Sequence, residues 1–184
     1  MGKNFVIVGI GGSLRKGSLS MAVMRSAVDL IPKGAEMEIA DLAEIPVFNQ
    51  DYETSPPEPV RRLKEQIKRA DAVLFVTPEY NFGLPGYLKN AIDWASRPYG
   101  DNSFEGKAGA IISSSNGMLG GIKAQLQLRQ SLVYLDVHAL NDSIAISNVD
   151  KKLGPDGKLA DERTVEHVKE MLADLVEWAG RIKK

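Results

Sequence analysis

The sequence contains no cysteine among its 184 residues. Disulfides, thiolate nucleophiles and cysteine metal sites are therefore excluded, and any redox chemistry would have to come from a bound cofactor. An excess of charge of one sign is also lacking, because 23 Lys and Arg nearly balance 24 Asp and Glu. A nucleic-acid-binding protein would show a basic excess. We therefore expect no nucleic-acid partner.

Long apolar runs are missing as well. The apolar segment at residues 5–10 is too short for a secretory signal, and no stretch approaches the roughly 18 residues that span a bilayer. We therefore expect no membrane segment and a cytoplasmic location. Only two histidines occur, and no group of His, Asp and Glu has the spacing of metal ligands, so we also expect no metal.

The sequence does contain an alternation of strand and helix patterns. Continuous apolar runs predict strands buried on both faces, and apolar residues at helical spacing predict helices. The predicted strands are residues 5–10, 36–40, 72–76, 108–113 and 137–146. The predicted helices are residues 20–31, 60–69, 86–96, 121–135 and 161–182. Strands that alternate with helices imply a parallel sheet covered on both faces, and we predict one α/β domain over residues 1–184.

Three loops follow strands of this sheet, at the edge where doubly wound proteins bind ligands. The first reads GGSLRKGSLS at residues 11–20. Its glycines let backbone amides turn toward an anion, and its serines, Arg15 and Lys16 favour a terminal phosphate. The spacing is neither that of a dinucleotide fingerprint nor that of a Walker loop. The alternative is a plain strand-to-helix turn capped by Ser18 or Ser20.

The second loop reads TPEYNFGLPG at residues 77–86. Its aromatic residues and prolines form a stiff, partly apolar wall, and Asn81 could bind the edge of a planar heterocycle. A rigid turn is the alternative, although Glu79 and Asn81 have no obvious packing role. The third loop, SSSNGMLGG at residues 113–121, offers closely spaced amides that could stabilise negative charge on a reduced ring. A flexible connector is the alternative there.

Together the loops resemble those of the NAD(P)H-dependent FMN reductases, most closely the bacterial quinone and chromate reductase branch. The resemblance rests on GSLRKGS, on PEYN followed by GLPGYLKNAIDW, and on SSSNGMLGG, in that order, and it covers residues 5–180. It implies a flavodoxin-like three-layer fold with a five-stranded parallel sheet in the order 2-1-3-4-5. It further implies bound FMN, NADPH or NADH as electron donor, and a homodimer or homotetramer with the site at a subunit interface.

The resemblance also implies roles for particular residues. The FMN phosphate would be held by Ser13, Arg15, Ser18 and Ser20. The flavin ring would be lined by Pro78, Glu79, Tyr80 and Asn81, and its far edge approached by Ser114, Asn116 and Gly117. One departure is Leu19-Ser20, where many relatives have Phe-Asn. Ser20 can still donate to phosphate, but the contact of that Asn is absent.

The implied activity is hydride transfer from NAD(P)H through FMN to quinones and other small acceptors, chromate among them. The flavin carries the chemistry, so no side-chain nucleophile is required, and water or Tyr80 could relay protons. One alternative is a flavodoxin-type electron carrier, which the near-neutral charge and the Tyr-Asn-Phe-Gly segment disfavour. A second alternative is a regulator that binds a nucleotide or phosphate without catalysis.

Several other residues receive structural interpretations. His138 is expected at a strand edge or in packing, His167 in solvent, and Trp94 and Trp178 in the core or a subunit contact. Asp161-Glu162 begins the last predicted helix, where negative charge is favourable. Arg129 has two interpretations, a subunit contact and a surface charge. The apolar residues of its helix exceed one core-facing stripe and favour oligomerisation. They are Leu126, Leu128, Leu132, Val133 and Leu135.

Overall fold

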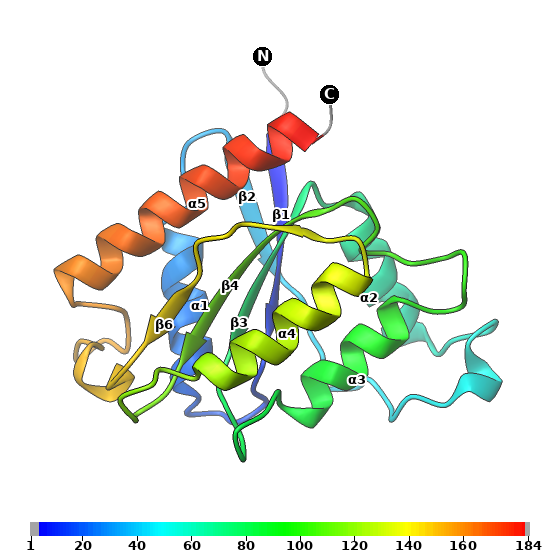
Figure 1. Ribbon diagram of the computed structural model, residues 1–184, viewed down its shortest axis with the longest axis horizontal. Helices are drawn as coiled ribbons and strands as arrows, with labels where there is room; N and C mark the ends of the chain where they lie inside the picture. The colour runs from blue at the N-terminus through cyan, green and yellow to red at the C-terminus, as the bar shows by residue number, and fades with distance from the viewer. Residues whose placement is uncertain (1–3, 183–184) are drawn as a thin grey trace.

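A computed structural model describes residues 4–182 of the chain, in which helices pack on both faces of a parallel sheet (Figure 1). The strands are β1 (Phe5–Gly11), β2 (Ala35–Ile39), β3 (Ala72–Thr77), β4 (Ala108–Ser114), β5 (His138–Ala139) and β6 (Ile144–Ile146). The helices are α1 (Leu19–Asp29), α2 (Glu58–Arg69), α3 (Gly86–Ala95), α4 (Ile122–Tyr134) and α5 (Glu162–Ile182). Short 3-10 helices lie at η1 (Gln50–Tyr52) and η2 (Val149–Lys151).

The strands follow the order β2-β1-β3-β4-β5, and β6 also pairs with β4. All the pairings are parallel. The order confirms the flavodoxin-like arrangement expected from the sequence. It also explains the continuous apolar runs, because β3 and β4 are buried at every position and must present apolar side chains to both faces.

Two hydrophobic cores lie on opposite faces of the sheet. One face is covered by α1 and α5, which pack Met24, Val168 and Leu172 against it. The other face is covered by α2, α3 and α4, which contribute Ile67 and Leu128 among others. Figure 1 shows these two helical layers with the sheet between them. No helix within residues 4–182 has both the length and the apolar character needed to cross a bilayer.

The prediction of one strand at residues 137–146 is wrong, because the chain leaves the sheet between β5 and β6. Two side chains of α4 hold this interruption. The guanidinium of Arg129 donates to the carbonyl oxygen of Leu140 at 2.7 Å. The amide nitrogen of Gln125, one turn earlier, donates to the carbonyl oxygen of Ile144 at 2.7 Å. Arg129 therefore has a role within the chain that neither interpretation of the sequence included.

The aromatic and imidazole side chains mostly lie as expected. Trp94 is fully buried, and its indole donates to the carbonyl oxygen of Pro46 at 2.8 Å. Trp178 is half-buried and donates to the carbonyl oxygen of His138, whose own side chain is exposed on β5. The imidazole of His167 lies near the surface, 3.0 Å from a carboxylate oxygen of Asp142. His138 therefore lies at the sheet edge and His167 at the surface, as the sequence predicted.

Candidate functional site

The carboxyl ends of β1, β3 and β4 meet at one edge of the sheet, the lower edge in Figure 1. The register places Gly11 beside Val76 and Thr77 beside Ser113. The loops that follow these strands are therefore neighbours. The amide of Gly12 donates to the carbonyl oxygen of Val76 at 2.8 Å, which joins the first loop directly to β3.

The first loop buries three hydroxyl groups in front of α1. Ser13, Ser18 and Ser20 are all nearly inaccessible to solvent. The Oγ atom of Ser18 accepts from the amide of Met21 at 3.2 Å and lies 3.0 Å from the Oγ atom of Ser20. Ser18 therefore caps α1, as one interpretation of the sequence predicted. The first amides of a helix have no partner within the helix, so this loop also presents donors suited to an anion.

Arg15 and Lys16 lie exposed in the same loop. The backbone amide of Arg15 donates to the Oγ atom of Ser13 at 3.4 Å. Its guanidinium makes no hydrogen bond or ion pair with any other residue of the described part of the chain. A guanidinium beside a helix N-terminus can bind phosphate oxygens in a bidentate manner. The first loop thus combines fixed donors with two exposed positive charges.

Gly12 is the point at which the first two loops touch. A Cβ atom at this position would lie 2.4 Å from Thr77 Oγ1 and 2.8 Å from both Thr77 Cα and Pro78 Cδ. Two of these atoms cannot move without moving the backbone or a proline ring. Glycine is therefore required for close approach of the loops.

The second loop forms a tight hairpin turn. Tyr80 and Gly83 exchange backbone hydrogen bonds of 3.1 and 2.9 Å. The two central residues are in the left-handed region, Asn81 with φ 50° and Phe82 with φ 61°. The side chains of Asn81 and Phe82 are exposed. Positive φ at both central residues defines a type I′ turn.

The carboxylate of Glu79 lies at the amino end of α4. One oxygen, Oε2, accepts from the amides of Lys123 at 2.9 Å and of Ala124 at 3.1 Å. The sequence predicted that Glu79 lines the flavin ring, and this contact was missed. A signal was available, because α4 begins after Gly121 and has no capping side chain of its own. Such a helix needs an acceptor from elsewhere.

Two tyrosine hydroxyls connect the second loop to the first. The hydroxyl of Tyr80 lies 3.4 Å from the Oγ atom of Ser13. Tyr87, at the start of α3, donates to the carbonyl oxygen of Gly11 at 2.7 Å. Burial raises the pKa of the Tyr87 phenol, with a smaller contribution from Tyr80, so the hydroxyl stays protonated. The sequence had assigned no role to Tyr87.

The third loop brings one unpaired polar atom to this edge. Ser114, the last residue of β4, is buried, and within residues 4–182 its hydroxyl has no hydrogen-bond partner. Its neighbour Ser113 donates to the carbonyl oxygen of Gly120 at 2.7 Å. Asn116 and Gly117 lie exposed further along the loop. An unpaired buried hydroxyl is unfavourable unless a ligand pairs it, so Ser114 fits a cofactor at this edge.

The predicted residues of the first two loops and Ser114 thus lie at one edge of the sheet, and the carboxylate of Glu79 is the exception. The first and second loops meet at Gly12 and at the contact of Ser13 with Tyr80, and Ser114 ends the strand next to β3. The carboxylate of Glu79 is directed to α4 instead. Within residues 4–182 no group of three or more His, Asp or Glu side chains could hold a metal ion.

Comparison with known proteins agrees with this arrangement. The family model described as NADPH-dependent FMN reductase matches residues 6–151. An NAD(P)H-dependent FMN reductase of Pseudomonas aeruginosa is 44% identical over 100% of both chains. A quinone reductase of Escherichia coli is 38% identical, again over 100% of both chains. The solved structure of FerB, a flavoenzyme NAD(P)H:(acceptor) oxidoreductase from Paracoccus denitrificans, superimposes with a TM-score of 0.86 at 35% identity and covers 96% of this chain and 98% of its own. The chain therefore belongs to the NADPH-dependent FMN reductase family.

Proposed function

We propose that this chain reduces quinones with electrons that it takes from NADH or NADPH through bound FMN. Membership of the family makes the chain a flavin-dependent oxidoreductase. Quinones are the acceptors named for the Escherichia coli relative. The observation that carries the proposal is the buried, unpaired hydroxyl of Ser114 at the same edge of the sheet as a loop of buried serines. A cofactor that joins a phosphate to a polar ring would bind the serine loop through its phosphate and form a hydrogen bond with Ser114 through its ring.

The proposal assigns each loop a part of the cofactor. The phosphate would be held by Ser13, Arg15, Ser18 and Ser20. The ring would be lined by Pro78, Tyr80 and Asn81 together with the backbone of Glu79. The far edge of the ring would lie against Ser114, Asn116 and Gly117. These assignments are supported by the burial of the serines and by the unpaired guanidinium of Arg15.

FMN supplies the redox chemistry when it is bound, since its ring accepts a hydride and passes electrons to an acceptor. The residues of the chain bind and orient it. The hydroxyl of Tyr80 lies 3.4 Å from Ser13 Oγ, so we assign Tyr80 to binding and assign the protons of quinone reduction to water. The exposed side chains of Asn81 and Phe82 leave the second loop open to solvent. We therefore extend the proposal to other small acceptors, chromate included.

An absorbance spectrum tests the proposal. The purified protein should show flavin bands that bleach with NADPH or NADH under nitrogen and return with benzoquinone. Bands that bleach with dithionite but with neither NADH nor NADPH would instead support the alternative of a flavodoxin-type electron carrier. A colourless protein that takes up no added FMN would contradict the proposal and favour the regulator.

Ser114→Ala tests the assignment of the third loop. We expect it to weaken FMN binding about fivefold, because a hydroxyl that pairs a ligand typically contributes about 1 kcal/mol. Ser103→Ala is the matched control, since the hydroxyl of Ser103 is also buried and unpaired but lies outside the three loops. Equal FMN affinity of the two variants, measured by quenching of flavin fluorescence, would remove Ser114 from the site.

We also propose that the chain assembles through the outer face of α3 and α4. Leu126, Val133 and Tyr134 of α4 are exposed by 61%, 73% and 79%. A groove of about 820 Å³ between the two helices is lined by Tyr99 and Tyr134 together with polar side chains such as Lys89 and Gln130. Apolar side chains gathered in this way favour a protein partner, and a second copy is the simplest one.

Sedimentation velocity at micromolar concentration tests this assembly. The unaltered chain should sediment as a dimer or tetramer, and Val133→Glu should sediment as a monomer because it places a charge in the apolar face. Lys169→Glu, on α5, is the control and should leave the assembly unchanged. An unaltered chain that is wholly monomeric would contradict this part of the proposal.

A further inference from the structure

The hairpin turn at residues 80–83 holds a bulky residue in an unfavourable backbone conformation. Type I′ turns favour Asn-Gly at their two central positions, because both positions need positive φ. Here the second central residue is Phe82, with φ 61°, and the glycine follows one position later. A bulky side chain is rare in this region of φ. Such strain persists only where the surroundings hold the conformation in place.

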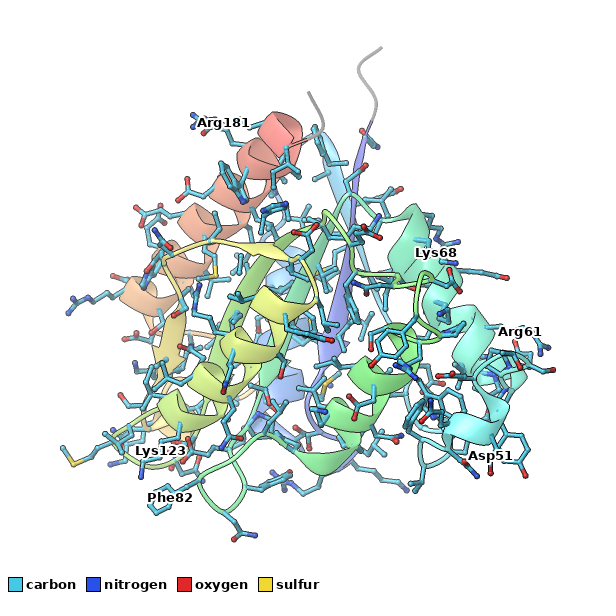
Figure 2. All side chains as sticks on the ribbon, turned by 45° about the vertical axis from the view of Figure 1, so that its right-hand side comes forward. Asp51, Arg61, Lys68, Phe82, Lys123 and Arg181 are labelled. Carbon is cyan, nitrogen blue, oxygen red and sulfur yellow. The ribbon has the colours of Figure 1, made fainter. Side chains whose placement is uncertain are left out.

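Three contacts with α4 hold this turn, one on each side and one at the tip. Before the turn, the carboxylate of Glu79 accepts from the amides of Lys123 and Ala124. At the tip, the ammonium nitrogen of Lys123 lies 3.3 Å from the centroid of the Phe82 ring. Figure 2 shows these two labelled side chains next to each other at the amino end of α4.

The third contact lies after the turn. The amide of Leu84 donates to the Oε1 atom of Gln127 at 2.9 Å. Gln127 follows Lys123 by four residues, so the two side chains lie one above the other on the same face of α4. The face of a single helix thus fixes both ends and the tip of the turn. The benefit is mutual, since Glu79 also supplies the cap that α4 lacks.

We propose that Glu79, Lys123 and Gln127 are positioning residues, here called the α4 latch, which keep the hairpin turn in its strained form. Without the latch, Phe82 would leave the left-handed region and the turn would open, which would displace Tyr80 and Asn81. The consequence for FMN rests on the proposed function, because it is that proposal which places Tyr80 and Asn81 at the flavin ring. The strained turn and its contacts with α4 do not depend on it.

The latch also accounts for the direction of Glu79. A carboxylate facing a flavin would oppose the negative charge that reduction adds to the ring. Directed at the N-terminus of α4, the same charge is stabilised by two amides and by the helix dipole. Glu79 therefore anchors the second loop while its charge is held by another element.

Hydrogen exchange of the FMN-free protein tests the latch directly. We expect Gln127→Ala to speed amide exchange at residues 80–84 about tenfold, because the bond to Leu84 restrains local opening. Lys123→Met, which removes the cation, should speed it about threefold. Gln130→Ala is the matched control: Gln130 is the same residue type on the same helix, and its side chain makes no hydrogen bond within residues 4–182. Exchange in Gln127→Ala equal to that in Gln130→Ala would overturn the proposal.

Relief of the strain provides an independent check. In a Phe82→Gly background the turn can form without support, so Gln127→Ala should then speed exchange only about twofold. An undiminished tenfold effect in that background would show that Gln127 does not act against the strain, which would contradict the latch.

The effect on the cofactor is measured with Glu79. Glu79→Ala should weaken FMN binding about tenfold and broaden the visible absorption bands of the bound flavin, because the ring loses its fixed surroundings. Glu79→Gln keeps an oxygen that can accept from the α4 amides and should restore most of the affinity. Failure of the unaltered chain to bind FMN would contradict the proposed function, whereas the exchange measurements would still decide the latch. Normal FMN binding by Glu79→Ala, together with unchanged exchange at residues 80–84, would overturn the latch alone.

Discussion

The first loop and the hairpin of the second loop lie side by side, yet they are held in different ways. The end of the first loop next to α1 is fixed by bonds within its own segment: the backbone amide of Ser18 donates to the carbonyl oxygen of Arg15 at 3.0 Å, and the Ser18 side chain caps α1. The hairpin is fixed by Glu79 and Leu84, whose partners on α4 lie 43 to 45 residues further along the chain. A local sequence motif therefore encodes the serine segment of the first loop that precedes α1, while tertiary packing is needed for the second loop.

This difference has a consequence for motion. The bonds of Ser18 lie within the first loop and the first turn of α1, so they hold this part of the loop in the FMN-free protein. The conformation of the hairpin instead depends on its contacts with α4, so a shift of that helix would move the hairpin. The outer face of that helix carries the exposed Leu126 and Val133 of the proposed assembly. Assembly of two copies would therefore restrain the second loop and leave the first unchanged.

Gly12→Ala changes the point at which the two loops touch, and we expect the largest effect from it. The new methyl group would collide with Thr77 and Pro78, which should destabilise the fold by about 2 kcal/mol and abolish FMN binding. Thermal unfolding and flavin titration measure the two effects. Gly17→Ala is the control, because its Cβ atom would meet only Arg15 Nη1, at 3.5 Å. A fully stable Gly12→Ala variant that binds FMN would show that the loops can separate.

Ser18→Asp separates the stability of the first loop from its ligand. Asp caps a helix as well as Ser does, so the thermal stability of the FMN-free protein should be retained. The added negative charge would repel a phosphate, and we expect FMN binding to weaken about a hundredfold. Ser18→Ala should show the opposite pattern, losing about 1 kcal/mol of stability and less of the affinity. Unaltered FMN binding by Ser18→Asp would place the phosphate elsewhere.

The same contrast explains what the sequence could predict. The limits of β1, β3 and β4 agree with the apolar runs to within a residue, because strands buried on both faces need uninterrupted apolar sequence. The roles of the serines in the first loop could be predicted for a related reason, since a helix cap and an anion-binding loop are both formed by residues close together in the sequence. Both structures are specified by residues close together in the chain.

The features that the sequence did not reveal depend on distant partners. The interruption between β5 and β6 is held by Gln125 and Arg129 of α4. Asn141, Asp142 and Ser143 are turn-favouring residues within it, and the prediction of one continuous strand passed over this local signal. The positive φ of Phe82 runs against its local preference, so local reasoning could not predict it. The uncapped start of α4 indicated that the helix needs an acceptor from elsewhere, but that Glu79 supplies it became visible only once α4 was placed next to the second loop.

Tyr87→Phe tests one of the bonds that the first loop makes with distant residues. It removes the donor to the Gly11 carbonyl, and we expect a loss of about 1 kcal/mol in stability and about fivefold in FMN affinity. Burial raises the pKa of Tyr87 in the folded chain. Its stabilisation is therefore complete below about pH 10, the unfolded value, and is lost as the pH rises further. The difference in unfolding free energy between Tyr87→Phe and the unaltered chain should accordingly shrink above that pH. A difference in unfolding free energy that stays constant above about pH 10 would mean that the Tyr87 hydroxyl is not buried in the folded chain.

Ser20→Ala should have the smallest effect, and hydroxyl chemistry gives the reason. The hydroxyls of Ser18 and Ser20 lie 3.0 Å apart and have one hydrogen each, so one hydrogen bridges the pair and one remains for a ligand. Without Ser20, the hydroxyl of Ser18 can turn its hydrogen to the phosphate. We therefore expect FMN binding to weaken by no more than about threefold. A flavin titration that showed a loss as large as that of Ser18→Asp would mean that Ser20 donates directly and that its Oγ atom, rather than that of Ser18, is the principal hydroxyl of the first loop.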